Sequence, residues 1–497
     1  MQAGGGYKKC LKCLKLRVPK VEHNKKNKHK KHKMAVEGRT HRPVINRDLC
    51  QRCGVCIRAC PAELLPELRS GEDTTRGYVY TNTDLGSREV FPPCVGACPI
   101  GQQVRDYVQL LEAGKVEEAL VVIRQDNPLP GVCGYVCHHP CEQACIRGSW
   151  DSPVSIRELK RSAVHYEMDH SDEILAALRE RRQAPRGKKV VIVGAGPAGL
   201  ACGFELVMHG YGVKVMDALA QPGGMLVGGI PPFRLPRRVI EHDVGIIRSL
   251  GVEFVPSVRI GAEVPLEEVR GDGVDAVIVA TGTWKDLTLG VPGEGTEGYL
   301  KCLDFLGALN AGEEMKLSGT VLVVGGGNAA IDAARSALRV GPEEVIVVYR
   351  RSREEMPASR EEVQSALEEG VELRYLVAPK RVIHEAGKVR GLELVRMELG
   401  DPDESGRRRP IPVEGSEFIE AGDYVIPAIG QRSEASFLRE ESVSDQGMIR
   451  CNGNGQVAGF EGVFAAGDAV SGPSTVVEAI ASGKTAAWRV MDYLERE

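Results

Sequence analysis

Two stretches of this sequence repeat one pattern, in which a short apolar run, a glycine-rich turn, a helical stretch and a second apolar run follow one another. They are KKVVIVGAGPAGLACGFELVMHGYGVKVMD (188–217) and GTVLVVGGGNAAIDAARSALRVGPEEVIVVYRR (319–351), with first glycines Gly194 and Gly325. One glycine-rich turn alone is weak support for any function. Two of them, each following a β-branched strand and each opening a helix, predict two parallel α/β units that bind dinucleotides.

The first unit carries a complete G-x-G-x-x-G pattern and an acidic residue at the end of its second strand. Gly194 permits the tight turn, Gly196 lets the backbone approach a pyrophosphate, and Gly199 lets the helix pack closely on the strand. Asp217 is placed to accept hydrogen bonds from a ribose, and the helix N-terminus faces the phosphate charge. The predicted dinucleotide site comprises Gly194, Gly196, Pro197, Ala198, Gly199 and Asp217.

The second unit has two basic residues where the first has its aspartate. Arg350 and Arg351 follow its second strand, and arginine at this place favours the 2′-phosphate of NADPH over the free ribose of NADH. We therefore predict an NADP site, with NAD as the alternative. Its expected residues are Gly325, Gly327, Asn328, Ala329, Ala330, Arg350 and Arg351.

A third glycine motif, GVFAAGDA (462–469), lies after both units, and an ATG turn (280–282) lies between them. This order resembles that of two-dinucleotide flavoenzymes such as the disulfide reductases, in which the NADP domain is inserted within the FAD domain. The resemblance implies that the first unit binds FAD, that Asp468 bonds the ribityl–phosphate region, and that a helix beginning near Val476 points its positive end at the flavin. It adds Thr281, Gly282, Gly467, Asp468, Thr475 and Val476 to the expected FAD site.

The chain lacks the redox-active cysteine pair of the disulfide reductases. Beyond residue 146 only Cys202, Cys302 and Cys451 occur, far apart in sequence, and we interpret them as ordinary thiols. Twelve of the fifteen cysteines precede residue 146. Because the sequence has no apolar run that could span a bilayer and no signal-peptide core, we expect a cytoplasmic chain whose thiols stay reduced. In that setting the cysteines are expected to be metal ligands.

The first cysteine group matches the C-x2-C-x2-C-x3-C-P run of bacterial ferredoxins. A loop with this spacing wraps three corners of a cubane 4Fe–4S cluster. Zinc is the alternative, but structural zinc rarely takes three ligands so close together. The predicted ligands are Cys50, Cys53, Cys56 and Cys60 in this group and Cys94, Cys98, Cys133, Cys137, Cys141 and Cys145 in a second, helical region.

The second group stands in PPCVGACPIGQQVRDYVQLLEAGKVEEAL and NPLPGVCGYVCHHPCEQACIRG, which resemble the N-terminal domain of the glutamate synthase small subunit and of dihydropyrimidine dehydrogenase. PGGMLVGGIPPFRLP (222–236) and VVYRRSREEMPASREEV (347–363) extend the resemblance over residues 92–497. The resemblance implies two 4Fe–4S clusters around residues 94–170. It also implies that the loop with Gly224 and Ile230 lies against the flavin ring.

The sequence departs from this family in three places. Residues 85–93 lack the family's C-x2-C, Lys160 stands where one family cluster takes a Glu or Gln ligand, and the segment at 50–60 is an addition. The ten predicted ligands suffice for two all-cysteine clusters. A third cluster needs two more ligands, from Cys10 and Cys13, from other side chains or from a partner chain. We predict two 4Fe–4S clusters, with three as the alternative.

The expected fold is α/β, with two nested Rossmann-like, disulfide-reductase-like dinucleotide-binding domains preceded by an α-helical iron–sulfur domain and a ferredoxin-like segment. Residues 1–33 carry 12 Lys/Arg against one acid, which predicts a disordered tail. A nucleic-acid arm is the alternative, but nothing downstream is built to read bases, so we expect no nucleic-acid partner. The predicted parts are the tail (1–35), the ferredoxin-like segment (36–92), the helical iron–sulfur domain (93–186), the FAD-binding domain (187–288 and 423–497) and the NAD(P)-binding domain (289–422).

Together these features predict an NAD(P)H-dependent iron–sulfur flavoprotein oxidoreductase. A flavin accepts a hydride and releases single electrons, which a nicotinamide cannot do. Hydride transfer needs no side-chain acid or base, so we nominate no catalytic residue. The expected acceptor or donor is a ferredoxin or a partner iron–sulfur subunit in a hetero-oligomeric complex, such as a formate dehydrogenase, a hydrogenase or an electron-bifurcating complex. The alternatives are a glutamate synthase small subunit and an electron-wiring subunit with a vestigial nucleotide site.

Overall fold

The computed structural model describes residues 92–271, 273–403 and 406–496, which fall into two compact units with a boundary after Glu180. The basic tail, the ferredoxin-like segment and six predicted or alternative cluster ligands lie outside the described residues. These six are Cys10, Cys13, Cys50, Cys53, Cys56 and Cys60.

The first unit is helical in its described part, as the spacing of its apolar residues predicts. Val104, Tyr107 and Leu111 lie on one face of their helix and are buried. A buried ion pair joins two longer helices, because Arg124 donates to both carboxylate oxygens of Glu167 at 2.8 and 2.6 Å. The helices are α3 (Pro93–Gly96), α4 (Val104–Glu112), α5 (Val116–Asp126), α6 (Pro130–Val136), α7 (Pro140–Gln143), α8 (Ile156–Asp169) and α9 (Ser171–Arg181).

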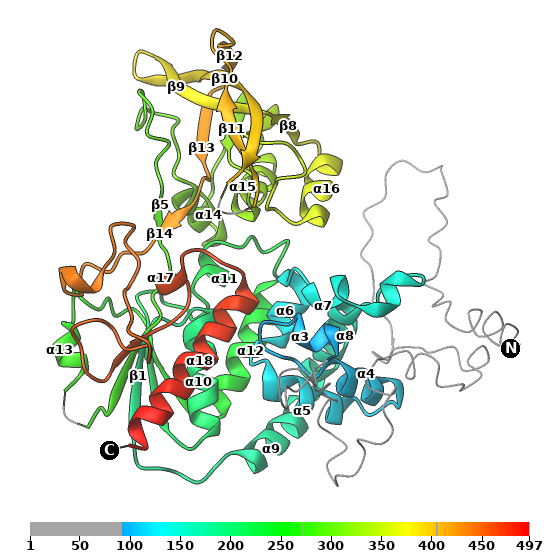
Figure 1. The fold of residues 1–497 in the computed structure, drawn as a ribbon, viewed down its shortest axis with the longest axis vertical. Helices are drawn as coiled ribbons and strands as arrows, with labels where there is room; N and C mark the ends of the chain where they lie inside the picture. The colour runs from blue at the N-terminus through cyan, green and yellow to red at the C-terminus, as the bar shows by residue number, and fades with distance from the viewer. Residues whose placement is uncertain (1–91, 272, 404–405, 497) are drawn as a thin grey trace, which may run out of the picture. The chain divides into compact units, whose positions relative to one another are not determined.

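The second unit is built on two parallel sheets. The first has the strand order β15-β4-β1-β2-β3, so a strand from near the C-terminus completes a sheet begun some 270 residues earlier. Helices α10 and α18 pack against each other beside this sheet (Figure 1). Its elements are β1 (Lys189–Val193), α10 (Pro197–Met208), β2 (Gly212–Met216), α11 (Met225–Gly228), α12 (Arg237–Ser249), β3 (Val252–Val255), α13 (Leu266–Val269), β4 (Ala276–Val279), β15 (Val463–Ala465), α17 (Asp468–Ser471) and α18 (Val476–Leu494).

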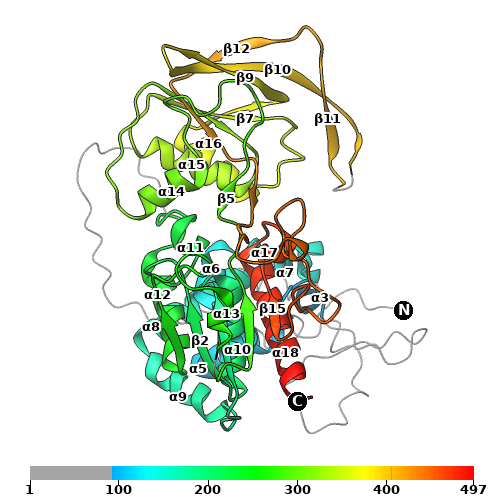
Figure 2. The same cartoon turned by 90° about the vertical axis from the view of Figure 1, so that its left-hand side faces the viewer.

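The second sheet, with the order β13-β6-β7-β8, lies in the segment between β4 and β15. An antiparallel group formed by β9, β10, β11 and β12 stands at the far end of this part (Figure 2). Its elements are α14 (Cys302–Asn310), β6 (Thr320–Val324), α15 (Asn328–Leu338), β7 (Glu344–Tyr349), α16 (Arg360–Glu369), β8 (Glu372–Tyr375), β9 (Val377–Glu385), β10 (Lys388–Pro402), β11 (Arg408–Pro412), β12 (Phe418–Ala421) and β13 (Tyr424–Pro427).

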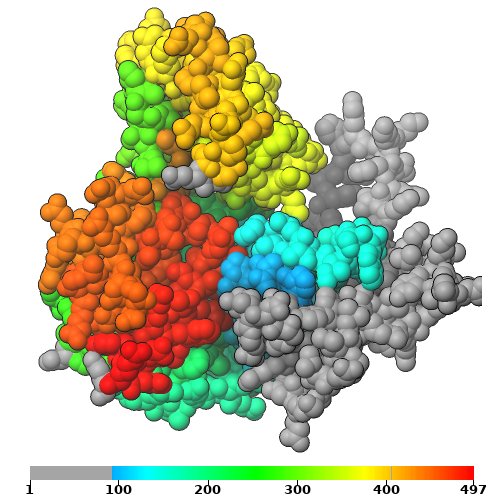
Figure 3. Space-filling view, in the orientation of Figure 1, coloured from blue at the N-terminus to red at the C-terminus, as the bar shows by residue number. Residues whose placement is uncertain are grey.

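Two short antiparallel strands, β5 (Lys285–Asp286) and β14 (Gln431–Arg432), connect the two sheet systems. The chain therefore leaves the first sheet through β5 and returns through β14, which is the nested α/β arrangement that the motif order predicts. In Figure 3 the returning segment (orange) and the C-terminal helix (red) adjoin one another on the surface of the first-sheet part.

The structure places two boundaries a few residues from the predicted positions. The helical unit ends after Glu180, although the prediction extended it to 186. Strand β13 pairs with β6 through Tyr424–Val321, so it belongs to the second sheet although the predicted FAD segment resumes at 423. Sequence alone did not reveal this pairing, because an apolar strand carries no mark of its partner. In the described part of the chain, no helix combines the length and apolar character that a membrane span requires.

Candidate cofactor-binding sites

The first glycine turn connects β1 to α10 at the carboxyl end of the first sheet. Gly194 has φ +108°, and a Cβ there would overlap the carbonyl of Ala280 at the end of β4. Asp217 accepts backbone hydrogen bonds from Ala195 at 2.5 Å and Leu219 at 2.7 Å, and burial raises the pKa of its carboxyl. Asp217 thus stabilises the glycine turn through its hydrogen bond from Ala195. The ribose contact predicted for Asp217 would be a second role.

Three further segments reach the same sheet edge. Thr281 follows β4, and its buried hydroxyl has no hydrogen-bond partner within the described residues. Asp468 follows β15, where Ser474 donates to it at 2.7 Å and burial raises the pKa of its carboxyl. Helix α18 begins at Val476 behind Thr475, whose side chain accepts from the backbone of Glu478 in a capping box. A buried, unpaired hydroxyl beside a glycine turn and a helix N-terminus suits a large polar ligand such as FAD.

The loop 222–236 packs directly on the first glycine turn. A Cβ on Gly224 would lie 2.8 Å from the Cα of Gly196, so the two backbones approach as closely as only glycine allows. Trp284 covers the same loop, since its ring would meet a Cβ placed on Gly228 at 2.8 Å. Trp284 was not among the expected site residues; the signal in the sequence was an aromatic residue two positions after the ATG turn.

The second glycine turn has the same construction. Gly325 has φ +151°, and a Cβ there would overlap the carbonyl of Ala428 after β13. The ring of Tyr349 covers Gly326, while the Cβ position of Gly327 faces open space at the start of α15. Ala330 is fully buried one turn into this helix. The open side at Gly327 leaves room for a phosphate at the helix N-terminus.

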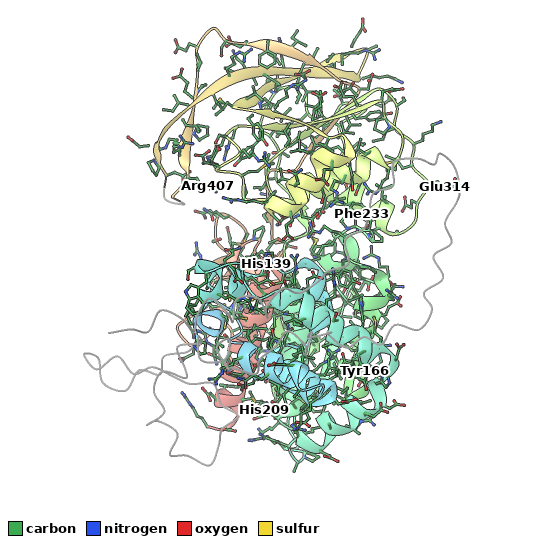
Figure 4. The ribbon with its side chains drawn as sticks, turned by 90° about the vertical axis from the view of Figure 1, so that its right-hand side faces the viewer. His139, Tyr166, His209, Phe233, Glu314 and Arg407 are labelled. Atoms are coloured by element: carbon green, nitrogen blue, oxygen red, sulfur yellow. The ribbon has the colours of Figure 1, made fainter. Side chains whose placement is uncertain are left out.

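The two arginines after β7 occupy different environments. Arg350 is exposed at the strand end. Arg351 is only 4% exposed, donates to the carbonyl of Arg408 at 2.8 Å, and forms an ion pair with Asp403 at 2.6 Å. Its guanidinium holds the β10–β11 hairpin, at whose tip Figure 4 shows Arg407. Of the two arginines, only Arg350 is exposed, and its contact with a 2′-phosphate stays a prediction.

The six described cysteines of the second group lie on or beside α3, α6 and α7. Cys98, Cys137 and Cys141 interact electrostatically with one another. Burial raises the pKa of Cys137 and raises that of Cys141 to about 12, and Lys160 opposes both shifts. Cys133 is fully buried inside α6, where its Sγ contacts Asn127 at 3.9 Å.

Cys94 and Cys145 complete the set. Cys94 lies in α3, which packs against α7, and its thiol interacts electrostatically with Tyr107, as do those of Cys98 and Cys141. Cys145 immediately precedes a short 3-10 helix at Ile146–Ser149. Among the residues that the structure describes, no three His, Cys, Asp or Glu side chains lie close enough to hold a single metal ion. The thiols of a 4Fe–4S cluster stand farther apart than the ligands of a single ion, because each thiol binds a different iron. Neighbouring thiols that are too far apart for one ion therefore suit a cluster.

The three remaining cysteines are free thiols at separate places. Cys202 is buried in α10 and donates to Gly483 O at 3.1 Å, and Cys302 is buried at the start of α14. Cys451 is partly buried before β15. Their interpretation as ordinary thiols stays a prediction.

Three family patterns match the chain. Residues 188–483 match the pyridine nucleotide-disulphide oxidoreductases, and residues 89–172 match the 4Fe-4S cluster domain II of dihydropyrimidine dehydrogenase. Residues 42–65 match a 4Fe-4S binding domain. These matches confirm an FAD- and NADP-binding oxidoreductase region preceded by two 4Fe–4S-binding domains.

Several characterised proteins are similar over most of this chain. The NADP(+)-dependent formate dehydrogenase subunit beta of Moorella thermoacetica is 42% identical over 82% of this chain and 60% of its own length. The NADPH-Fe(3+) oxidoreductase subunit beta of Geobacter sulfurreducens is 43% identical over 81% of this chain and 64% of its own length. The chain thus spans less than two thirds of these relatives. The glutamate synthase [NADPH] small chain of Escherichia coli is 36% identical over 81% of this chain and 89% of its own length.

A solved structure agrees with the fold. FprA of Mycobacterium tuberculosis in complex with NADPH superposes with a TM-score of 0.55 at 20% identity, over 62% of this chain and 85% of its own. At this identity the likeness concerns the arrangement of helices and strands alone.

Proposed function

Because the chain belongs to the pyridine nucleotide-disulphide oxidoreductase family and carries 4Fe–4S-binding domains, we propose that it is the electron-transferring subunit of a larger redox complex. In this role it passes electrons between NADPH, FAD and iron–sulfur clusters, and onward to or from a ferredoxin or a partner iron–sulfur subunit. The relatives from Moorella and Geobacter, which are named as beta subunits, support a hetero-oligomeric assembly.

The observation that carries this proposal is that two glycine turns occur in one chain together with a cysteine-rich helical unit. When bound, FAD supplies the ability to accept a hydride and to release electrons one at a time. The first turn, Thr281 and the N-terminus of α18 bind and orient it. The second turn binds the nicotinamide dinucleotide, and exposed Arg350 selects the 2′-phosphate.

An anaerobic NADPH titration of the full chain tests the proposal. We expect NADPH to bleach the flavin absorbance and to produce the electron paramagnetic resonance (EPR) signal of reduced clusters, with added ferredoxin reduced in turn. The control is Gly325→Val, in which the new side chain overlaps Ala428 and blocks the nucleotide turn. This variant should respond to dithionite but not to NADPH. A wild-type flavin that NADPH leaves oxidised would instead favour an electron-wiring subunit with a vestigial nucleotide site.

A glutamate synthase small subunit is the second candidate, favoured by the match to 89% of the Escherichia coli small chain. It predicts glutamine-dependent NADPH oxidation when the co-purifying partner chain is present. Identification of that partner chain by mass spectrometry separates the two candidates, since only one of them requires a glutamate-forming large subunit.

A further inference from the structure

Lys160 is a buried cation in the middle of the helical unit. It lies on α8, its side chain is enclosed so that the residue is only 6% exposed, and its Nζ donates to Oε1 of Gln102 at 3.1 Å. Gln102 is itself 2% exposed and donates to the carbonyl of Ile123 at 3.4 Å. The amide is thus held in place by α5 and presents its oxygen to the ammonium.

The partner of Lys160 is neutral, which sets it apart from the other buried cations of the described chain. Each of the other four has a carboxylate within ion-pair distance, whereas Lys160 has an amide. The four pairs are Arg124–Glu167, Arg335–Glu362, Arg351–Asp403 and Lys484–Glu205. A buried ammonium without an anion is strongly unfavourable, so an anion is expected beside Lys160.

Two cysteines, Cys137 and Cys141, lie within electrostatic reach of Lys160. Helix α8 packs on α6, since a Cβ on Gly134 would lie 3.0 Å from the Cβ of Arg161. One turn before Lys160, Arg157 donates to the carbonyl of Cys137 at 3.2 Å. Lys160 acts electrostatically on the thiols of Cys137 and Cys141, and Cys98 acts on both thiols as well.

We propose that Lys160 is the counter-cation of an iron–sulfur cluster bound by Cys98, Cys137 and Cys141, and that it raises the reduction potential of this cluster. Thiolate-ligated clusters are anionic, and net charge together with hydrogen bonds to the sulfurs sets their potentials. A fixed positive charge favours the reduced state, which carries one more electron. Gln102 positions the ammonium. The inference deepens the proposed function and rests on it for the presence of the cluster.

The test compares potentials in the intact chain. Lys160→Met removes the charge at similar volume, Lys160→Arg keeps it, and Lys115→Met removes an exposed lysine of the same unit as a control. Iron is counted, and each protein is titrated with dithionite under EPR detection. We expect Lys160→Met to lower the equilibrium constant for reducing one cluster at least tenfold, or about 59 mV for one electron. Lys160→Arg and Lys115→Met should stay near the wild-type potential.

The potential and the iron content of the Lys160 variants decide whether the proposal holds. An unchanged potential with full iron in Lys160→Met overturns the proposal. Loss of about four irons in Lys160→Met, but not in Lys160→Arg, supports it, because the charge is then needed to retain one cubane. Equal iron loss in both variants overturns it, since charge is then irrelevant. Dithionite bypasses the nucleotide, so failure of the proposed NADPH reaction would appear separately as an unbleached wild-type flavin.

Discussion

Arg234 donates from Nη1 to both carboxylate oxygens of Asp332, at 2.9 Å each. Arg234 lies in the loop that packs on the first glycine turn, whereas Asp332 lies on α15 after the second turn. The guanidinium of Arg339 lies over the ring of the adjacent Phe233, 3.8 Å from the ring centroid. Asn310 of α14 donates to Gly228 O at 3.1 Å. These contacts tie the two nucleotide-binding parts together.

At pH values above the raised pKa of Asp332, replacing Arg234 with Met should destabilise the second unit by about 3–5 kcal/mol, because the buried carboxylate then loses its hydrogen-bonded partner. Denaturant unfolding measures this change, and stopped-flow reduction by NADPH should slow as well. Arg238→Met, an exposed neighbour at the start of α12, serves as the control and should change neither quantity. Wild-type stability in the Arg234 variant would show that the Arg234–Asp332 pair does not stabilise the second unit.

The same pair predicts a pH dependence. Burial raises the pKa of Asp332 to about 7, although Arg234 opposes the shift. The folded state therefore retains this proton at pH values where the unfolded carboxyl has lost it. The contribution of Asp332 to stability is complete below the unfolded pKa and declines as pH rises from about 4 to 7. Asp332→Asn should remove that decline, which unfolding curves of both proteins at several pH values would reveal.

Replacing Arg350 with Glu should weaken NADPH far more than NADH, because a carboxylate then faces the 2′-phosphate. Loss of a charge-assisted contact of about 1.5–3 kcal/mol corresponds to roughly a tenfold to hundredfold fall in the NADPH/NADH preference. The ratio of kcat/KM values for the two nucleotides measures it. Arg351→Met is the contrast: it should lower the unfolding temperature by releasing Asp403 and leave the ratio nearly unchanged. An unaltered ratio in Arg350→Glu would refute the assignment.

Replacing Glu167 with Gln should destabilise the helical unit by about 3–5 kcal/mol, since Arg124 is fully buried and loses its counter-charge. We also expect iron to be released at lower denaturant concentration. The matched control is Glu118→Gln on α5, the helix that also carries Arg124. The ion pair of Glu118 with Lys115 is exposed and contributes about 0–1 kcal/mol. Equal effects of the two substitutions would show that burial does not govern these pairs.

The iron content tests the predicted number of clusters. Ten cysteines outside the tail predict two cubanes and about eight irons per chain, whereas three clusters predict about twelve. Truncation before Met34 removes Cys10 and Cys13 without touching the other ligands. Colorimetric iron analysis should find no change. A fall of about four irons would show that the tail supplies ligands.

Local chemistry made much of this protein predictable. A glycine turn needs backbone conformations that other residues rarely adopt, so Gly194 and Gly325 mark their strand–helix junctions directly in sequence. The cap at Thr475 is likewise set by neighbouring residues, and α18 begins at Val476 as expected. The cysteine spacing indicated iron–sulfur chemistry, which the family matches support.

The sequence by itself determined the two nucleotide turns and the cysteine-rich character of the N-terminal part, because these depend on residues close together in the chain. The order of the glycine motifs along the chain indicated the nesting, through its resemblance to two-dinucleotide flavoenzymes. Only the tertiary structure distinguished Arg350 from Arg351, since a distant hairpin covers one and leaves the other exposed. It also paired Arg234 with Asp332 across 98 positions and Lys160 with Gln102 across 58. Such pairs arise from how helices and loops pack. Burial lowers the local dielectric constant and so strengthens the interaction between the paired groups, which residue type alone does not encode.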